Sequence, residues 1–296
     1  MRLNCGYEAP ACKAEALRLL AVNSGVRNLR IFAGGTDLLL RVRAGKEKDP
    51  TVLDISGLGL DYIEEEADLI RVGAMVTLSR AQKFFADLPE PLRLQSVSSG
   101  RVGCWQTRNV ATLAGNVCTG LPSADAAVTL LCLEAGIRAE SVRGSRLIPI
   151  DEFFKGPRRL ALEEDEMVTE IVIPKPIAPD GGRFGGDFEK LGRRGELFIS
   201  VLSVGCLLQL NAAGAVEKAR LACGVLAPAP IRLYETEKFL AGKNLTDDLL
   251  LKAGEVMRGE IKPRDSYRGS RRYREAAGVN VMKRVVKKSA ERAGRA

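Results

Sequence analysis

The stretch IFAGGTD, residues 31–37, decides the fold that the sequence predicts. It continues an alternating segment from Leu29 to Ala33 that is typical of a short strand, and it precedes the apolar start of a helix at residues 38–45. Two consecutive glycines allow backbone amides to turn toward an anion, and a helix N-terminus favours negative charge. The stretch therefore predicts a cradle for a pyrophosphate. The alternative is a tight strand-to-helix turn, since glycine also has purely conformational uses.

Two widespread phosphate-binding motifs are absent from the chain. The sequence contains neither the Gly-x-Gly-x-x-Gly pattern of dinucleotide-binding folds nor the Gly-x-x-x-x-Gly-Lys-Ser/Thr pattern of P-loop proteins. Any phosphate site built on residues 31–37 therefore belongs to a different fold.

A second stretch, RNVATLAGN at residues 108–116, combines small side chains with hydrogen-bonding groups. Thr119, Ser123 and Asp125 follow it. This composition suits a polar ligand with several hydroxyls that lies along the backbone. Asp125 stands near the start of a predicted helix, where it can accept hydrogen bonds from ligand hydroxyls. Its alternative role is to stabilise that helix N-terminus, which favours acidic side chains.

Length and composition bound the class of protein. The chain has 296 residues, 46% of them hydrophobic and 5% aromatic, with 45 basic and 37 acidic residues and a net charge of +8. Such a chain has room for about two globular domains, at roughly 150 residues each. It contains no histidine. The absence of histidine excludes a Ser-His-Asp triad, a Cys-His dyad, His-ligated zinc and a cofactor attached covalently through histidine.

The seven cysteines are scattered and form no Cys-x-x-Cys pair. We therefore expect reduced thiols, no iron–sulfur cluster or other metal site in this chain, and a cytoplasmic location. The N-terminus lacks the apolar core of a signal peptide. No apolar run approaches the roughly 20 residues of a membrane helix, so we expect no membrane span.

Hydrophobic periodicity predicts a mixed α+β protein. We expect helices near residues 12–23, 38–45, 77–85, 123–134, 234–240, 246–257 and 271–288, and strands near 29–33, 51–55, 69–72, 137–141, 147–150, 167–173, 199–210 and 216–225. The stretch 174–186 holds three prolines and four glycines. These are too many for a regular element, so we expect the domain boundary there.

The two small-residue stretches together resemble the FAD-binding subunit of the molybdenum hydroxylases, which include xanthine dehydrogenase and carbon monoxide dehydrogenase flavoproteins. The resemblance covers essentially the whole chain and is closest to bacterial xanthine dehydrogenase flavin subunits. It extends through these further segments: Ser123 to Asp125, Gly156-Pro157, Phe188 to Arg194, Gly224 to Arg232, Pro263 to Arg268 and Tyr273-Arg274. Ala114 departs from the family pattern, which has glycine there.

The resemblance implies an α+β fold in two domains. A PCMH-type FAD-binding domain would span residues 1–176, with subdomains at about 1–56 and 57–176. A linker at 177–186 would lead to a smaller α+β domain at 187–296, of the carbon monoxide dehydrogenase flavoprotein C-terminal type.

The resemblance also implies how noncovalent FAD would be held. Residues 31–37 would wrap its pyrophosphate, and Thr112 to Asn116 would lie along the flavin and diphosphate. Asp125 would bind the hydroxylated chain, while Val102, Met167 or Val168, and Lys190 would contact flavin or adenine. No catalytic residue is expected. The implied cofactor-binding residues are Arg30, Ile31, Phe32, Ala33, Gly34, Gly35, Thr36, Asp37, Val102, Thr112, Leu113, Ala114, Gly115, Asn116, Thr119, Ser123, Asp125, Met167, Val168 and Lys190.

The implied function is electron transfer in a heteromeric complex, most simply a xanthine dehydrogenase. FAD on this chain would accept electrons from 2Fe-2S clusters on a small partner subunit and pass them to NAD. Substrate oxidation would take place at molybdopterin on a large partner subunit. The same flavin role in a carbon monoxide dehydrogenase-like or an aromatic acyl-CoA complex is the alternative.

The C-terminal segment, residues 262–288, is strongly basic. Such a run can bind nucleic acid, but its cations surround the predicted helix and no aromatic platform is interleaved with them. We therefore expect a solvated surface or a subunit contact rather than nucleic-acid binding.

Overall fold

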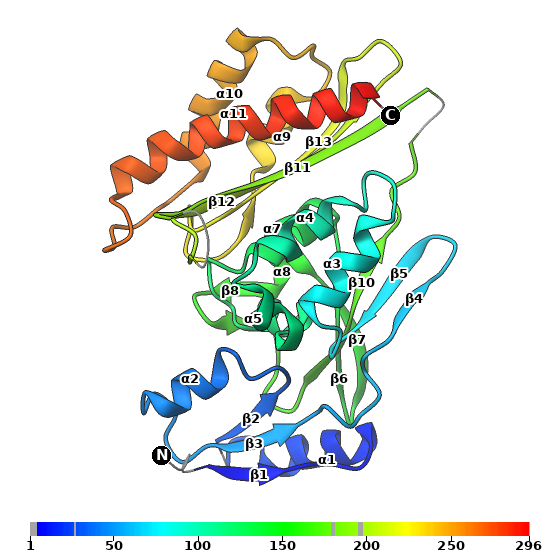
Figure 1. Ribbon diagram of the computed structural model, residues 1–296, viewed down its shortest axis with the longest axis vertical. Helices are drawn as coiled ribbons and strands as arrows, with labels where there is room; N and C mark the ends of the chain where they lie inside the picture. The colour runs from blue at the N-terminus through cyan, green and yellow to red at the C-terminus, as the bar shows by residue number, and fades with distance from the viewer. Residues whose placement is uncertain (1–4, 27, 179–180, 195–197, 296) are drawn as a thin grey trace.

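The computed structural model describes residues 5–26, 28–178, 181–194 and 198–295. The chain forms an elongated molecule in which three sheets follow one another along the long axis (Figure 1). The N-terminal sheet lies at one end, a five-stranded sheet with its helices lies in the middle, and a four-stranded sheet lies at the other end. This arrangement confirms the α+β class.

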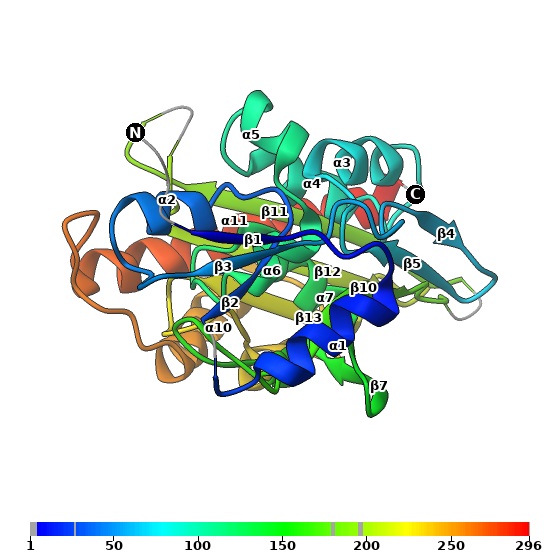
Figure 2. The same ribbon diagram turned by 90° about the horizontal axis from the view of Figure 1, so that it is seen from below.

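The N-terminal sheet is parallel and has the strand order β1-β3-β2. It is built from β1 (Gly6–Glu8), β2 (Leu29–Phe32) and β3 (Thr51–Asp54), with α1 (Lys13–Asn23) and α2 (Leu38–Arg43) in the connections. Parallel neighbours need crossover connections, and these two helices provide them. Figure 2 views this sheet and α1 from below. An ion pair between Lys13 and Glu140, 2.9 Å long, joins α1 to the middle sheet.

The middle sheet is antiparallel and has the order β4-β5-β10-β6-β7. Its strands are β4 (Ile63–Glu65), β5 (Leu69–Gly73), β6 (Gly136–Ser141), β7 (Gly144–Pro149) and β10 (Met167–Pro174). The helices are α3 (Leu78–Ala86), α4 (Leu94–Arg101), α5 (Trp105–Val110), α6 (Leu113–Cys118), α7 (Asp125–Cys132) and α8 (Ile150–Phe153), and a small hairpin of β8 (Phe154–Gly156) and β9 (Arg159–Leu160) follows. Thr77 caps α3, since its hydroxyl accepts a hydrogen bond from Arg80 N.

The C-terminal sheet is antiparallel and has the order β11-β12-β13-β14. It comprises β11 (Arg183–Leu191), β12 (Leu202–Leu210), β13 (Val216–Gly224) and β14 (Ile231–Arg232), followed by α9 (Tyr234–Leu240), α10 (Asp247–Glu260) and α11 (Arg271–Arg295). Helix α11 packs on β11 and β12. The expected helices at 234–240 and 246–257 and the antiparallel pair at 199–210 and 216–225 are confirmed.

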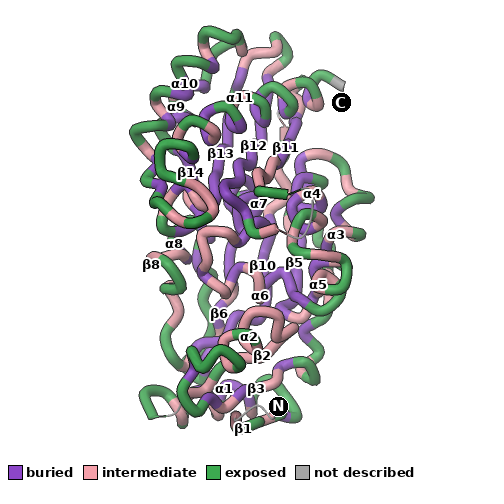
Figure 3. The backbone as a smooth tube through the Cα atoms, turned by 60° about the vertical axis from the view of Figure 1, so that its left-hand side comes forward, coloured by how far each residue is buried: buried purple, intermediate pink, exposed green. Residues whose placement is uncertain are grey.

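One helix lies between the middle and C-terminal sheets and is buried on every side. All eight residues of α7 are buried (Figure 3), and the apolar core that contains six of them also includes Leu207 of β12 and Ala222 of β13. The small residues of the C-terminal sheet permit this close approach. A Cβ on Gly205 would lie 3.1 Å from Val128 of α7. A second core fills the space between the C-terminal sheet and helices α9 to α11.

The expectation that residues 174–186 contain no regular element is wrong at both ends of the stretch. Pro174 is the last residue of β10, and β11 already begins at Arg183. The glycines near the end of this stretch allow close packing and do not form a turn. A Cβ on Gly185 would lie 2.0 Å from Ser289 O and 2.4 Å from Ala293 N, so glycine allows α11 to rest directly on the strand. Residues 179 and 180 lie outside the described residues. Helix α11 also extends beyond the expected residue 288 to Arg295.

Gly185→Ala tests this close contact. The added methyl group meets helix backbone, which cannot rotate away, so we expect a loss of about 1–3 kcal/mol of stability, measured by urea or thermal unfolding. Gly259→Ala is the matched control, because Gly259 lies at an exposed position of α10 and a Cβ there would meet no atom within 4 Å. The control should be as stable as the wild type or slightly more stable. Equal stability of the two variants would contradict the proposed reason for Gly185.

Candidate functional site

The glycine loop, residues 33–37, follows β2 and leads into α2. Residues 31–39 are all only partly buried, so the loop is accessible to a ligand. Gly35 has φ +67°, in the left-handed region that favours glycine. A Cβ at this position would also lie 2.5 Å from the Phe32 ring. The loop therefore requires glycine at Gly35 for its backbone conformation.

The first glycine of the pair brings the two small-residue stretches into contact. A Cβ on Gly34 would lie 1.9 Å from Val110 O and 2.9 Å from Ala111 Cα. Only glycine allows the loop to lie against the end of α5 and the residue before Thr112. Stretches about 75 residues apart in the chain thus form one backbone-lined surface, which the sequence alone predicted only through a resemblance.

The second stretch divides between core and surface. Thr112 is buried and caps α6, since its hydroxyl accepts a hydrogen bond from Gly115 N at 2.9 Å. Leu113 and Ala114 are buried in the core, at 0% and 3% exposure. Their side chains therefore pack inward, and a methyl group at Ala114 fits where the family has glycine.

Asn116 carries an unsatisfied polar atom. Its Oδ1 is buried and accepts no hydrogen bond from any residue that the structure describes. A buried acceptor without a partner costs about 1–3 kcal/mol, so a ligand that donates to it gains that energy. Thr119 lies one turn on and donates to Asn116 O at 2.8 Å. Ser123 is partly buried in the following loop.

Asp125 and Lys190 form a buried ion pair between the middle and C-terminal sheets. Lys190 Nζ lies 2.7 Å from Asp125 Oδ2, and both side chains are 4% exposed. Ser200 Oγ donates to the other carboxylate oxygen at 2.5 Å. Burial raises the pKa of the Asp125 carboxyl, while the adjacent Lys190 ammonium lowers it. Asp125 thus both begins α7 and anchors the C-terminal sheet, and the ammonium is held where α7 starts.

Lys190 is therefore not a surface lysine paired with Glu189. It also donates to Arg101 O at 3.0 Å, and it lies 4.7 Å from the centroid of the Phe198 ring. Glu189 on the opposite side of β11 pairs with Arg284 of α11 instead. Alternation along the strand sends the two neighbours to opposite faces.

Arg158 is a residue of this region that the sequence reasoning missed. Its guanidinium donates two hydrogen bonds to the Asp37 carboxylate, at 2.9 and 3.1 Å, and these hydrogen bonds raise the pKa of Arg158. Its backbone N donates to Gly120 O at 2.8 Å. The neighbouring Gly156-Pro157 is one of the segments that carry the family resemblance, but nothing local indicated a contact with the glycine loop.

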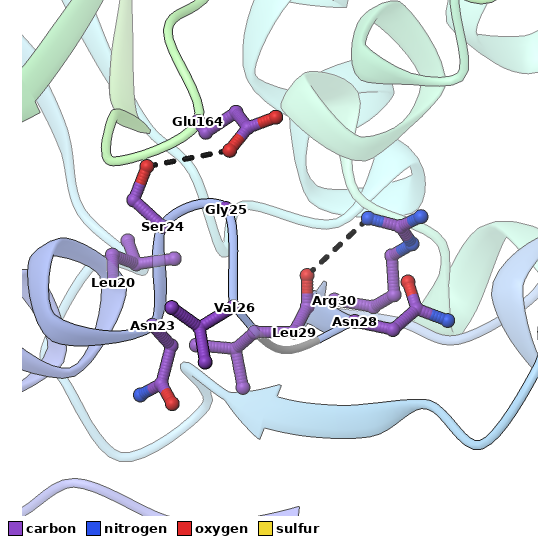
Figure 4. A pocket seen from close by; sticks show the side chains of 9 residues that line it. All are labelled: Leu20, Asn23, Ser24, Gly25, Val26, Asn28, Leu29, Arg30 and Glu164. Carbon is purple, nitrogen blue, oxygen red and sulfur yellow. Dashed lines mark hydrogen bonds between the residues drawn. The ribbon is translucent and has the colours of Figure 1, made fainter.

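Arg30 lines a different cavity. A cavity of about 400 Å³ lies at the beginning of β2, lined by residues of α1, the α1–β2 turn, β2 and Glu164 (Figure 4). Ser24 and Glu164 form a hydrogen bond across it. Arg30 is paired with Glu47 at 3.0 Å. The glycine loop follows the opposite end of β2, so this cavity is separate from the loop.

The remaining predicted contacts lie in regular structure. Val102 is partly buried and ends α4, and its carbonyl accepts from Arg108 at 3.1 Å. Met167 and Val168 are buried in β10, at 0% and 6% exposure. They belong to the same core as Leu113 and Ala114. Their burial assigns them a packing role, and a contact with FAD stays a prediction.

Cations of the basic C-terminal helix pair with acidic residues of the same chain. Arg284 pairs with Glu189, Lys287 with Asp247, and Arg292 with Asp187 at 2.8 Å. Much of the positive charge on α11 is thus neutralised locally, as on a solvated surface.

The chemistry of the assembled site is that of a binding surface. Gly34 lies against Val110 and Ala111, and Arg158 contacts both Asp37 and Gly120. In the described part of the chain, no three acidic or cysteine side chains gather as metal ligands would. Such a surface suits an extended, polar, anionic ligand rather than acid–base catalysis.

Comparison with known families places the chain among FAD-binding proteins. Residues 3–176 match the FAD-binding domain of molybdopterin dehydrogenases, and residues 187–289 match the C-terminal domain of carbon monoxide dehydrogenase flavoproteins. The chain is thus a flavoprotein of two domains.

Individual relatives extend over almost the entire chain. It is 30% identical to the nicotinate dehydrogenase FAD-subunit of Eubacterium barkeri, with 94% of each chain covered. It is also 30% identical to the xanthine dehydrogenase FAD-binding subunit of Escherichia coli O157:H7, with 97% of each covered. The solved carbon monoxide dehydrogenase from Hydrogenophaga pseudoflava superimposes with a TM-score of 0.91, at 26% identity over 98% of each chain. The chain therefore belongs to the FAD-binding oxidoreductase subunits of the molybdenum hydroxylase family.

Lys190→Met tests the ion pair between the domains. It leaves the Asp125 carboxyl buried without its cation, and breaking a buried pair in this way costs about 3–5 kcal/mol. Burial raises the pKa of Asp125 in the folded state, and the variant lacks the Lys190 cation that lowers this pKa. The Asp125 carboxyl therefore keeps its proton to a higher pH in the folded state than in the unfolded state. Stability of the variant should therefore fall as pH rises above about 4.

The measurement is the melting temperature of wild type and variant at pH 5 and pH 8. The deficit should be larger at pH 8. Asp125→Asn combined with Lys190→Met removes the stranded charge and should recover much of the loss. A pH-independent deficit, or no recovery in the double variant, would contradict a charged pair.

Proposed function

We propose that this chain binds FAD noncovalently and acts as the electron-transfer subunit of a molybdenum hydroxylase, most simply a xanthine dehydrogenase. The observation that carries the proposal is the contact of Gly34 with Val110 and Ala111, which assembles both small-residue stretches into one surface. The match of the chain to the FAD-binding family supports it.

The residues present fit FAD in chemical type. Residues 31–37 would hold its pyrophosphate through backbone amides, and Thr112 to Asn116 would lie along the flavin and diphosphate. Asn116 Oδ1, buried without a donor among the described residues, would receive one from the cofactor. Asp125 would bind the hydroxylated chain, and Lys190 would place a positive charge at the flavin. FAD, when bound, supplies the redox chemistry, and the protein orients and tunes it.

The partners belong to the same proposal. A small subunit with 2Fe-2S clusters would deliver electrons, a large molybdopterin subunit would oxidise the substrate, and NAD would be the final acceptor. We take residues 1–176 as the FAD-binding domain, with subdomains at about 1–56 and 57–176, and residues 187–296 as the second domain. All seven cysteines are free, which supports a reducing, cytoplasmic compartment. The described helices include none that is long and apolar enough to cross a bilayer.

The substrate is tested on the assembled complex. Relatives acting on nicotinate and on xanthine are equally similar to this chain, and a carbon monoxide dehydrogenase shares its structure. The complex should therefore be purified with its partners and assayed with xanthine, nicotinate and carbon monoxide, with NAD as acceptor. NAD reduction driven by xanthine supports the proposal. Turnover of another substrate would reassign the complex and leave the flavin role intact.

Noncovalent binding predicts that acid precipitation releases FAD. The purified chain should be yellow, and the supernatant after acid treatment should contain free FAD, identified by chromatography and fluorescence. Colour that stays with the precipitate would indicate a covalent link.

Asn116→Leu tests the unsatisfied amide. Leucine has a similar size and removes an acceptor that is unpaired without ligand, so the FAD-free protein should be as stable as the wild type or more stable. Loss of one hydrogen bond to the cofactor should weaken FAD binding about tenfold, the equivalent of about 1.4 kcal/mol. Binding is measured by titration of FAD-free protein with FAD.

The control for this variant is Asn280→Leu, at an exposed position on α11 of the C-terminal domain. It should leave FAD affinity unchanged. Wild-type affinity in Asn116→Leu would remove Asn116 from the site.

A further inference from the structure

We propose that Arg158 is a positioning residue for the cofactor site, because it fastens the end of the glycine loop to the segment that follows α6. The inference rests on the proposed FAD-binding function and concerns a residue outside both small-residue stretches. Arg158 acts through Asp37 and needs no contact of its own with the cofactor.

The backbone of Arg158 is fixed to Gly120, four residues beyond the second stretch. Its N donates to Gly120 O at 2.8 Å. Gly120 has φ +58°, and a Cβ there would lie 2.8 Å from Arg158 Cα, so the two backbones are in direct contact. The β8–β9 turn therefore carries Arg158 at a set position beside residues 112–120.

The side chain of Arg158 spans from this position to the glycine loop. Its two nitrogens bind the two oxygens of Asp37, a residue 121 positions away in the chain, in the bidentate geometry that suits arginine and carboxylate. Asp37 directly follows Gly34, Gly35 and Thr36. Holding its carboxylate therefore limits where the end of the loop can move relative to Gly120.

The backbone conformation of Arg158 allows the contribution of its side chain to be tested separately from that of its main chain. Arg158 has φ +58°, a region that disfavours residues with a Cβ and accepts glycine freely. Local conformation alone would thus prefer glycine at this position. What arginine provides at this position, and glycine cannot, is the ion pair with Asp37.

Arg158→Gly is consequently a sharp test. The variant relieves the backbone and removes the guanidinium, so its melting temperature without FAD should equal or exceed that of the wild type. Amide hydrogen exchange of residues 33–37 in the FAD-free protein should become faster. The dissociation constant for FAD should rise at least tenfold.

Three further variants and one control distinguish a positioning role of Arg158 from other roles. Asp37→Asn should weaken FAD binding to a similar extent, and the double variant with Arg158→Gly should be no weaker than either single one. Arg158→Lys keeps the charge without the bidentate geometry and should restore part of the affinity. Arg159→Ala is the matched control, since the described residues provide no ion pair for that exposed arginine. It should bind FAD as the wild type does.

The outcomes discriminate clearly. Wild-type FAD affinity or unchanged loop exchange in Arg158→Gly overturns the positioning role and leaves the proposed function standing. Weak binding in Arg158→Gly with normal binding in Asp37→Asn also overturns it, because it would mean that Arg158 contacts the cofactor directly. Failure of the wild-type chain itself to bind FAD would refute the proposed function instead.

Discussion

The burial of α7 between two sheets is the constraint on which the rest of this structure depends. All eight of its residues are buried, so the helix can exist only where both neighbours cover it. Gly205 of β12 and Gly224 of β13 leave room for Val128 to approach the strands. Since α7 begins with Asp125, the same packing also fixes the position of the carboxylate that pairs with Lys190.

Ion pairs near both ends of α7 add to the packing between the middle and C-terminal sheets. Asp125 pairs with Lys190 at the start of the helix, and Glu134, just beyond its end, pairs with Arg220 of β13 at 2.7 Å. Replacing such a pair by apolar residues can be harmless, whereas removing one partner strands a buried charge. Loss of Lys190 alone would therefore leave the buried Asp125 carboxylate without its cation. The same ammonium is the charge that the proposed function assigns to the flavin.

The candidate site is made of close backbone contacts more than of reactive side chains. Gly34 touches the end of α5, Gly120 touches Arg158, and Gly35 supplies a left-handed turn. The chain contains no histidine, the side chain whose unperturbed pKa lies nearest neutral pH. It can still bind and orient a cofactor that carries its own chemistry.

The sequence by itself determined the regular elements with strong periodicity, such as α1, β10 and α10, and it marked both small-residue stretches. It missed the short helices within residues 94–118 and the beginning of β11, because polar and glycine-rich segments carry no periodic signal there. Tertiary structure alone decided that Gly34 meets Val110, that Lys190 is buried against Asp125, and that Arg158 reaches Asp37. Each of these contacts joins residues at least 65 positions apart. Local patterns report the preferences of a segment, whereas such contacts depend on how the sheets and α7 pack together.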